Sequence, residues 1–216
     1  MTKNKVVALV NLWDQFEADH PGADLADFCR HYLLSQQAEP ASDPHEKRIP
    51  LEGRLSAAIY RMNKFTQFYA RKLMVDTPMS NMEDFIYLAT VLDHEQGDMR
   101  KSEVIHRNFS EFTSGISVIR RLVDRQFLEE YDDPDDARSR RVRITPLGRA
   151  TLYQSLGSLG HLAQIMYDCL TDAEKRLALR ILYKATQHHA HHYPHNRGLS
   201  GGEIVNYMTG KGIEEG

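Results

Sequence analysis

The sequence lacks the features that would place it outside a reducing cell interior. It has two cysteines, Cys29 and Cys169, which cannot build the disulfide framework of a small secreted protein. It also lacks an apolar run long enough to cross a membrane. The run that begins at Val6 is interrupted early by Asn11 and Asp14, and no small-residue cleavage site follows it. These absences predict a soluble, cytoplasmic protein.

An excess of positive charge is absent as well. The chain has 27 lysine and arginine residues against 30 acidic residues, a formal net charge of −3 and a pI near 6.4. Residues 99–149 hold eleven cations and nine acids, a net charge of only +2. Because affinity for nucleic acid depends on the charges that reach the groove, a DNA-binding surface here must come from the placement of a few cations.

The motifs of the common enzyme classes are also missing. The sequence has no Gly-x-Ser-x-Gly, no P-loop and no Gly-x-Gly-x-x-Gly after a strand, and no nucleophile is paired with a base. At 216 residues the chain has room for one substantial core or two small ones. We therefore expect a binding protein that has no enzymatic activity and no cofactor.

Residues 127–149 are the most informative stretch that is present. Two strand-like runs, 127–131 and 141–145, flank a turn rich in Asp, Pro and Arg, which predicts a β-hairpin with a loop longer than two residues. Four arginines fall within six residues of this hairpin: Arg138, Arg140, Arg141 and Arg143. They are too numerous to serve packing, although strand alternation places Arg141 and Arg143 on one face and Arg140 on the other.

Two helical patterns precede the hairpin. A short helix is expected from Ser102, a break at residues 108–110, and a second helix over about 111–125. On the second helix the apolar residues Ile116, Ile119, Leu122 and Val123 have the spacing of a core-facing stripe. Two helices followed by a cationic hairpin predict a winged helix-turn-helix, in a mainly α fold with a small β-hairpin wing.

The second helix has the composition of a recognition helix. Short hydroxyl side chains near its N-terminus can approach bases and phosphates, and longer arginines can reach further along the groove. An ordinary surface helix has a similar composition, but the wing directly behind it favours DNA recognition. The predicted DNA-binding residues are Thr113, Ser114, Ser117, Arg120, Arg121, Asp136, Arg138, Arg140 and Arg141.

The wing resembles that of MarR-type (multiple antibiotic resistance) bacterial transcription regulators. The matching residues are Asp136-Ala137-Arg138, then Val142-Arg143-Ile144-Thr145, then Gly148. Three positions depart from the family pattern: Ala137 is often a second arginine, Ile144 is usually leucine, and Gln126 stands where a glycine is usual. The resemblance covers about residues 51–192. It implies that Asp136 shapes the wing and that Arg138 enters the minor groove.

The resemblance also implies a homodimer. In MarR-type proteins the N- and C-terminal helices intertwine, and the apolar stripes expected over 51–73, 147–170 and 171–189 exceed what a small winged domain can cover. A two-fold dimer presents two recognition helices about one DNA turn apart, so the operator is expected to be a pseudo-palindrome. The alternative is that these stripes form the core of a monomer.

The domain organisation follows from these patterns. Helices over 6–17 and 25–34 exceed the minimal family pattern, and capping boxes are expected at Ser80–Glu83 and Thr171–Glu174. The predicted parts are an N-terminal helical extension (1–36), a linker (37–50), a dimerisation helix (51–75), the winged helix-turn-helix (76–149), C-terminal dimerisation helices (150–193) and a flexible tail (194–216).

Three further features leave alternatives open. His188 and His192 have the i, i+4 spacing of two metal ligands on a helix, but a solvated helix end is the simpler interpretation, and no metal is predicted. Cys29 and Cys169 could sense oxidants, but packing roles are favoured. Five aromatic residues could line an effector pocket or belong to the core: Trp13, Phe65, Phe68, Tyr69 and Tyr87.

The sequence as a whole predicts a sequence-specific, DNA-binding transcription regulator of MarR type. We expect a dimeric repressor that binds double-stranded DNA and is relieved by a small-molecule effector, with no membrane partner. The alternative is a winged-helix module that binds a protein partner without specific DNA binding.

Overall fold

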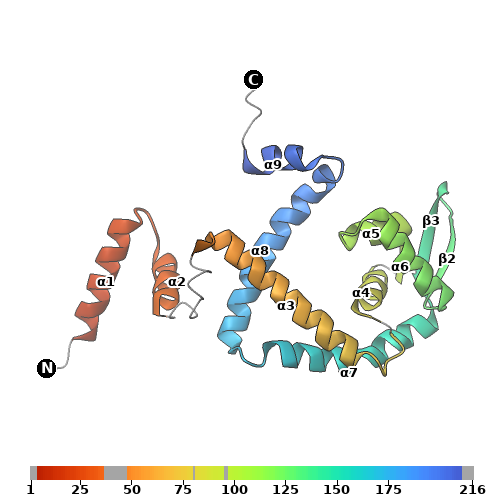
Figure 1. Ribbon diagram of the computed structural model, residues 1–216, viewed down its shortest axis with the longest axis horizontal. Helices are drawn as coiled ribbons and strands as arrows, with labels where there is room; N and C mark the ends of the chain where they lie inside the picture. Colours follow the sequence, from red (N-terminus) through yellow and green to blue (C-terminus); the bar gives the residue numbers. More distant parts are fainter. Residues whose placement is uncertain (1–3, 37–47, 80, 95–96, 211–216) are drawn as a thin grey trace, which may run out of the picture. The chain divides into compact units, whose positions relative to one another are not determined.

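The computed structural model describes residues 4–36, 48–79, 81–94 and 97–210 (Figure 1). The chain divides into two compact units, Met1–Ile59 and Tyr60–Gly216, which are described separately below. Most of the predicted linker, residues 37–47, lies outside the described residues. No helix in the described part of the chain is both long and apolar enough to span a bilayer.

The first unit contains a pair of helices held together by aromatic side chains. Helix α1 (Lys5–Asp19) begins where Asn4 accepts a hydrogen bond from the backbone N–H of Val6, and α2 is Leu25–Gln36. Phe16 and Phe28 are buried between the two helices, with ring centroids 5.6 Å apart. The predicted helices over 6–17 and 25–34 therefore correspond to α1 and α2. Helix α3 (Leu51–Leu73) begins in this unit and continues into the second.

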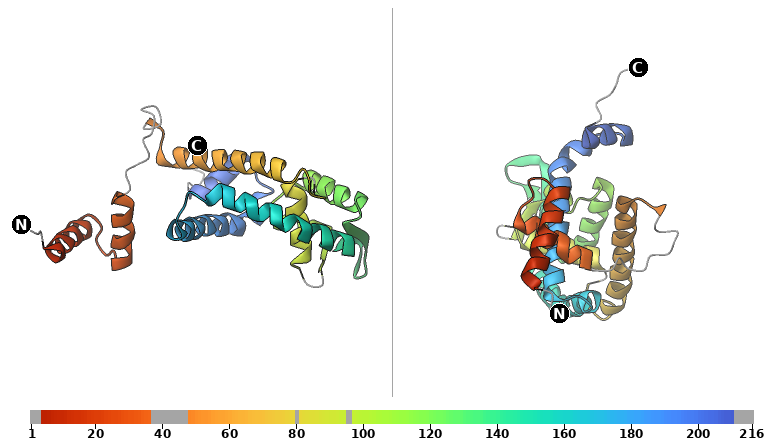
Figure 2. Two further views of the ribbon diagram at one scale, coloured as in Figure 1. Left: turned by 90° about the horizontal axis from the view of Figure 1, so that it is seen from below. Right: turned by 90° about the vertical axis from the view of Figure 1, so that its left-hand side faces the viewer.

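The second unit is mainly helical and carries one small sheet (Figures 1 and 2). After α3 its elements are α4 (Met82–Leu92), β1 (Asp98–Arg100), α5 (Lys101–Arg107), α6 (Phe112–Asp124), β2 (Leu128–Asp133), β3 (Asp136–Ile144), α7 (Pro146–Tyr167), α8 (Asp172–Asn196) and α9 (Gly201–Thr209). The β2–β3 hairpin lies at an edge of this unit in both Figure 1 and the left view of Figure 2. The predicted fold class, mainly α with a winged helix-turn-helix, is confirmed.

The core of the second unit lies where α4, α5 and α6 pack against the sheet. Its fully buried side chains include Val91, Met99, Ile105, Ile119 and Val142. Helix α7 adds Leu152, Leu162 and Met166 to this core, whereas no residue of α8 is buried. The helix-turn-helix and the hairpin thus belong to one tightly packed unit, which holds α6 and the hairpin in fixed positions.

The sheet differs from the predicted hairpin in two ways. It has three antiparallel strands in the order β1-β3-β2, because Met99 pairs with Val142, and the strand β1 was not predicted. The turn between β2 and β3 has only two residues, Pro134 and Asp135, so the predicted longer loop is wrong. The extra length lies instead within β3, where residues 137–139 have no partner on β2 and form a bulge at the wing tip.

The helix ends bear on three other expectations, with different outcomes. Asn81 caps α4 by accepting a hydrogen bond from the backbone N–H of Asp84 at 2.8 Å, while Ser80, predicted to begin the capping box, lies outside the described residues. The capping box of Thr171 and Glu174 is confirmed at the start of α8. Residues expected in a flexible tail instead continue α8 to Asn196 and form α9, because Ser200 and Glu203 make another capping box.

The two cysteines are exposed, which contradicts the expected packing role. In α2 it is Phe28 that points into the aromatic core, and a helix turns the next side chain, Cys29, about 100° away from that direction. Cys169 lies in the turn that follows α7.

Candidate nucleic-acid interface

A tight turn sets the angle between α5 and α6. Asn108 ends α5 with its side-chain amide donating to the carbonyl of Val104 at 2.8 Å. Phe109 has a positive φ of 50°, and the N–H of Ser110 donates back to the carbonyl of Ile105 at 3.2 Å. These hydrogen bonds satisfy the end of α5 and start α6 in a new direction. The predicted break at residues 108–110 is therefore in place.

Helix α6 packs very closely on α5. A Cβ atom added to Gly115 would lie 2.6 Å from the Ile105 side chain and 3.0 Å from the Tyr87 hydroxyl, so this position requires glycine. Val118, Ile119 and Leu122 complete the buried face. Of the predicted core stripe, Ile119 and Leu122 are buried, while Ile116 and Val123 are half-buried at its border.

The opposite face of α6 is open. Thr113, Ser114, Ser117 and Arg120 are all exposed, as their predicted role in DNA binding requires. Glu111, at the N-cap, makes no side-chain capping hydrogen bond, so the N–H groups of the first turn face outward without a side-chain cap. A helix N-terminus of this kind attracts phosphate oxygens.

Arg121 differs from the other predicted DNA-binding residues of α6. Its Nε donates to Asp84 Oδ1 at 2.8 Å, its Nη2 contacts the same oxygen, and Asp84 is fully buried on α4. A buried carboxylate needs such a partner, because leaving it unpaired is costly. Arg121 therefore ties α6 to α4. The signal in the sequence was an aspartate within the apolar stripe of α4, beside Tyr87, Leu88 and Val91.

Most wing cations are paired with acids of the wing or of β1. Arg141 Nε donates to Asp98 at 2.6 Å, Arg143 Nε to Glu129 at 2.9 Å and Arg140 Nε to Glu130 at 3.0 Å. Two cations at the start of α5 are bound in the same way: Arg100 to Asp133 at 2.6 Å and Lys101 to Glu130 at 2.9 Å. These ion pairs explain how a chain of modest local charge carries so many arginines near its wing.

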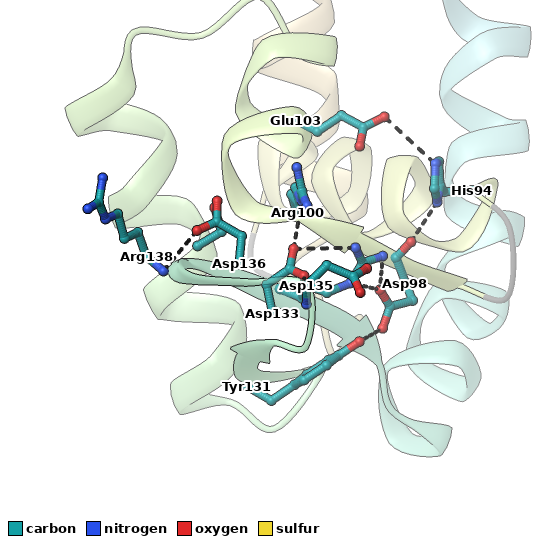
Figure 3. A network of polar contacts seen from close by, with 11 residues as sticks. His94, Asp98, Arg100, Glu103, Tyr131, Asp133, Asp135, Asp136 and Arg138 are labelled. Atoms are coloured by element: carbon teal, nitrogen blue, oxygen red, sulfur yellow. Dashed lines mark hydrogen bonds and ion pairs between the residues drawn. The ribbon is translucent and has the colours of Figure 1, made fainter.

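Asp98 and Asp133 are the two centres of this network, which Figure 3 shows from close by. Asp98 also accepts a hydrogen bond from the Tyr131 hydroxyl, and Asp133 from the backbone N–H of Asp135 at 3.0 Å. That backbone hydrogen bond, together with Arg100, lowers the pKa of Asp133. Neither centre was predicted from the sequence, because each joins elements that are far apart along the chain.

Arg138 stands apart from this network. Asp136 accepts hydrogen bonds from the Ser139 hydroxyl at 2.7 Å and from the backbone N–H of Arg138 at 3.1 Å, which together lower the pKa of Asp136. Asp136 thereby shapes the bulge, while the Arg138 side chain points away from the network (Figure 3). Among the described residues the guanidinium of Arg138 has no acidic partner, and it is exposed at the wing tip.

Gly148 closes the wing onto α7. A Cβ atom at this position would lie 2.1 Å from the carbonyl oxygen of Phe127, and Thr145 caps α7 by accepting from the N–H of Gly148 at 2.9 Å. Nearby, Gln126 has a positive φ of 61°, in the left-handed region that favours glycine. Gln126 therefore stands at a position whose backbone conformation a glycine would adopt more easily, which is the residue usual there in the resembled family.

A cavity of about 580 Å³ lies beside the helix-turn-helix. Residues of α3 (Asn63–Arg71), α4 (Asn81–Tyr87) and the turn at Asn108 and Ser110 line it. The Tyr87 hydroxyl is buried and has no hydrogen-bond partner among the described residues, and burial raises its pKa. Of the five aromatic residues considered for a pocket, Tyr87 lines this cavity, whereas Phe65 and Phe68 are exposed.

No group of three or more His, Cys, Asp or Glu side chains in the described part of the chain is arranged to hold a metal ion. His188 and His192 do lie side by side on α8, with ring centroids 4.8 Å apart.

Comparison with known proteins agrees with this architecture. Residues 79–148 match the family model described as a winged helix DNA-binding domain. No curated protein is a significant match to the sequence.

Solved structures with the same fold include three from bacteria. Sco3205 of Streptomyces coelicolor, a MarR family transcriptional regulator in complex with DNA, is 14% identical, with a TM-score of 0.58 over 70% of this chain and 92% of its own. BpsR of Bordetella bronchiseptica, whose DNA binding is regulated by 6-hydroxynicotinic acid, is 22% identical, with a TM-score of 0.56 over 62% and 98%. The C80S mutant of MarR from E. coli, complexed with operator DNA, is 21% identical, with a TM-score of 0.53 over 67% and 99%.

Proposed function

From a chain that carries a winged helix DNA-binding domain and has the fold of MarR family transcriptional regulators, we propose a regulator that binds double-stranded DNA in a sequence-specific manner. The observation that carries the proposal is the pairing of charges in the wing. Ion pairs occupy Arg140, Arg141 and Arg143, whereas Arg138 is exposed at the tip with no ion pair to any described residue. An unpaired arginine on a protruding hairpin is suited to a minor groove, whose negative potential attracts it.

The recognition helix supports the same function. Thr113, Ser114 and Ser117 are exposed near the N-terminus of α6, and Arg120 is exposed one turn further along. These side chains can contact base edges and phosphates in a major groove, while Asp84 and Arg121 hold the helix in place. We therefore assign Arg121 a positioning role, and Arg120 a direct contact with DNA.

The experiment is a binding measurement with the untagged full chain. Fluorescence anisotropy with DNA from upstream of its own gene, and with a scrambled duplex, at two salt concentrations should show preferential binding that weakens with salt. Binding that ignores sequence would favour the alternative of a winged-helix module for a protein partner.

A matched pair of variants tests the wing. Arg138→Ala should weaken specific binding by about tenfold and lower the salt slope by about one, because it removes a groove contact. Arg140→Ala should cost less, since its guanidinium is shared with Glu130 and Asp132 in the free protein. Equal affinities for the wild type and Arg138→Ala would overturn the role given to the wing tip.

We propose that the regulator is a homodimer. Helix α8 has 25 residues, none of them buried, and it exposes large apolar side chains such as Leu179, Leu182 and Tyr183. Exposed apolar surface on this scale favours burial against a partner protein. A second copy of the chain would bury it and would place two recognition helices on a pseudo-palindromic operator. We propose that this dimer acts in the cytoplasm.

We further propose that a small effector relieves repression by binding in the cavity between α3, α4 and the turn at Ser110. A ligand in this cavity could accept a hydrogen bond from the Tyr87 hydroxyl and change the packing of α4 against α6. A screen of small organic acids by thermal shift, with Tyr87→Phe as the control, tests this step. A ligand that stabilises both proteins equally would place the effector elsewhere.

A further inference from the structure

The C-terminal turns of α8 carry an unusual density of imidazole groups. Five histidines lie between residues 188 and 195: His188, His189, His191, His192 and His195. One turn of helix separates His188 from His192, so both side chains lie on one face, and their ring centroids are 4.8 Å apart. Two imidazoles at this spacing on a helix can share one metal ion.

A second element orients one of these rings. Helix α9 lies across the end of α8 (Figure 1), and its Tyr207 hydroxyl is 3.0 Å from His192 Nδ1. When His192 carries its proton on Nδ1, it donates to the tyrosine oxygen, and Nε2 presents a lone pair. Metal-binding histidines are usually held in this way, by a hydrogen bond from the second ring nitrogen to an oxygen behind it.

We propose that His188 and His192 form a binding site for a divalent transition metal of the Zn²⁺ type, with Tyr207 fixing the ring of His192. Imidazole nitrogens suit Zn²⁺, Ni²⁺ and Cu²⁺, and they are poor ligands for Mg²⁺, which prefers oxygen. The two protein ligands leave the remaining positions to water, so the ion exchanges readily with solvent. The metal binds the neutral ring, so its binding to imidazole weakens as the pH falls.

The site adjoins the helix-turn-helix through the next residue along α8. The Tyr193 ring lies 5.3 Å from that of Phe109 and 5.7 Å from that of His106, measured between centroids, and its hydroxyl donates to the carbonyl of Ser110 at 3.4 Å. Pro194 follows within the helix and has no N–H, so this turn lacks one backbone hydrogen bond. A metal ion that links His188 to His192 would stabilise the helical turn that holds Tyr193 against the helix-turn-helix.

The consequence for DNA rests on the proposed function. When Tyr193 is held in place, the turn between α5 and α6 stays in one conformation, and less conformational entropy is lost when α6 binds DNA. We expect Zn²⁺ to tighten binding to the operator, and the effect to vanish in Tyr193→Ala.

The site itself is tested without DNA. Isothermal titration of the untagged full chain with ZnSO₄, and with MgCl₂ as the negative control, should show binding of Zn²⁺ alone. The double variant H188Q/H192Q should bind Zn²⁺ at least about tenfold more weakly, and Tyr207→Phe should also lose about tenfold because the hydrogen bond behind His192 is removed. The matched control is H191Q/H195Q, which removes the other i, i+4 pair of the run and should retain the affinity.

The outcomes separate the site from the function. Equal losses in the two double variants, or full affinity in Tyr207→Phe, would overturn the site in favour of a diffuse histidine surface. Absence of Zn²⁺ binding would also overturn it, while leaving the proposed DNA binding intact. Zn²⁺ binding with no change in operator affinity would retain the site and overturn its connection through Tyr193.

Discussion

At the scale of single residues, the wing shows how surroundings give similar side chains different roles. Arg138 and Arg140 are two positions apart on β3, and both are exposed. The carboxylates of Glu130 and Asp132 bind Arg140, whereas Asp136 holds only the backbone N–H of Arg138, and the Arg138 guanidinium has no ion pair within the described part of the chain. Arg138 can therefore form new interactions with phosphates in a DNA groove without first breaking an ion pair.

A second feature at this scale is the backbone of Gln126. A residue with a side chain costs about 1–2 kcal/mol in the left-handed region, and glycine avoids that cost while losing more backbone entropy. We therefore expect Gln126→Gly to raise the free energy of unfolding by about 0.5–1 kcal/mol, measured by urea denaturation. The control is Phe109→Gly, at the other positive φ, where the lost contact with Tyr193 should cancel the gain. A lower stability of Gln126→Gly would show that its side chain contributes more than its backbone costs.

At the scale of elements, α6 is held on one face and free on the other. Gly115 allows α5 to approach, and the contact between Arg121 and Asp84 anchors the helix to α4. This division separates side chains that position the helix from the exposed ones that we propose contact DNA, although two neighbouring arginines, Arg120 and Arg121, look alike in the sequence.

The two arginines should separate in experiment. Arg121→Ala leaves Asp84 with less compensation in a buried site, so we expect the free energy of unfolding to fall by about 1–3 kcal/mol. Arg120→Ala should change stability by less than about 0.5 kcal/mol and weaken DNA binding. Urea denaturation and anisotropy on the same samples check both. The reverse pattern would show that the assigned roles are exchanged.

The wing should also respond to acid in a defined direction. The hydrogen bonds that Asp133 and Asp136 accept lower the pKa of both carboxyl groups in the folded state. Such groups contribute stability above their ordinary pKa of about 3.9, and this contribution is lost as the pH falls through the lowered values. We expect amide NMR signals of residues 133–140 to be unchanged between pH 7 and pH 5 and to change below about pH 4. A transition above pH 5 would contradict this assignment.

At the scale of the whole molecule, the described part of the chain leaves many large apolar side chains exposed. Helix α8 is the clearest example, because a helix of 25 residues without a buried side chain gains little stability from packing against the rest of its own chain. A second copy packed against it would join the DNA-binding heads into one assembly whose spacing an effector or a metal could change.

A pair of charge variants tests this interface. Leu182→Glu places a carboxylate in the proposed contact and should shift the protein to monomers in size-exclusion chromatography with light scattering. Lys184→Glu changes charge on the same exposed helix outside the Leu179, Leu182 and Tyr183 stripe and should leave the mass unchanged. A monomeric wild type would remove the basis for the paired operator.

The sequence by itself determined the helix-turn-helix, the wing and the fold class. Those features depend on local patterns: the apolar spacing of α6, the turn at residues 108–110 and the motif from Asp136 to Gly148. The predicted turn length was wrong because strand pairing between β2 and β3 runs further than their apolar residues indicate, and the excess residues enter a bulge.

Only the tertiary structure decided which charged side chains are available. Asp84 meets Arg121 across 37 positions of sequence, and Arg141 meets Asp98 across 43, so no local pattern could pair them. The same holds for Tyr207, which reaches His192 only because α9 folds back onto α8. An ion pair depends on distance in space, and for residues this far apart in sequence that distance is set by the packing of the core.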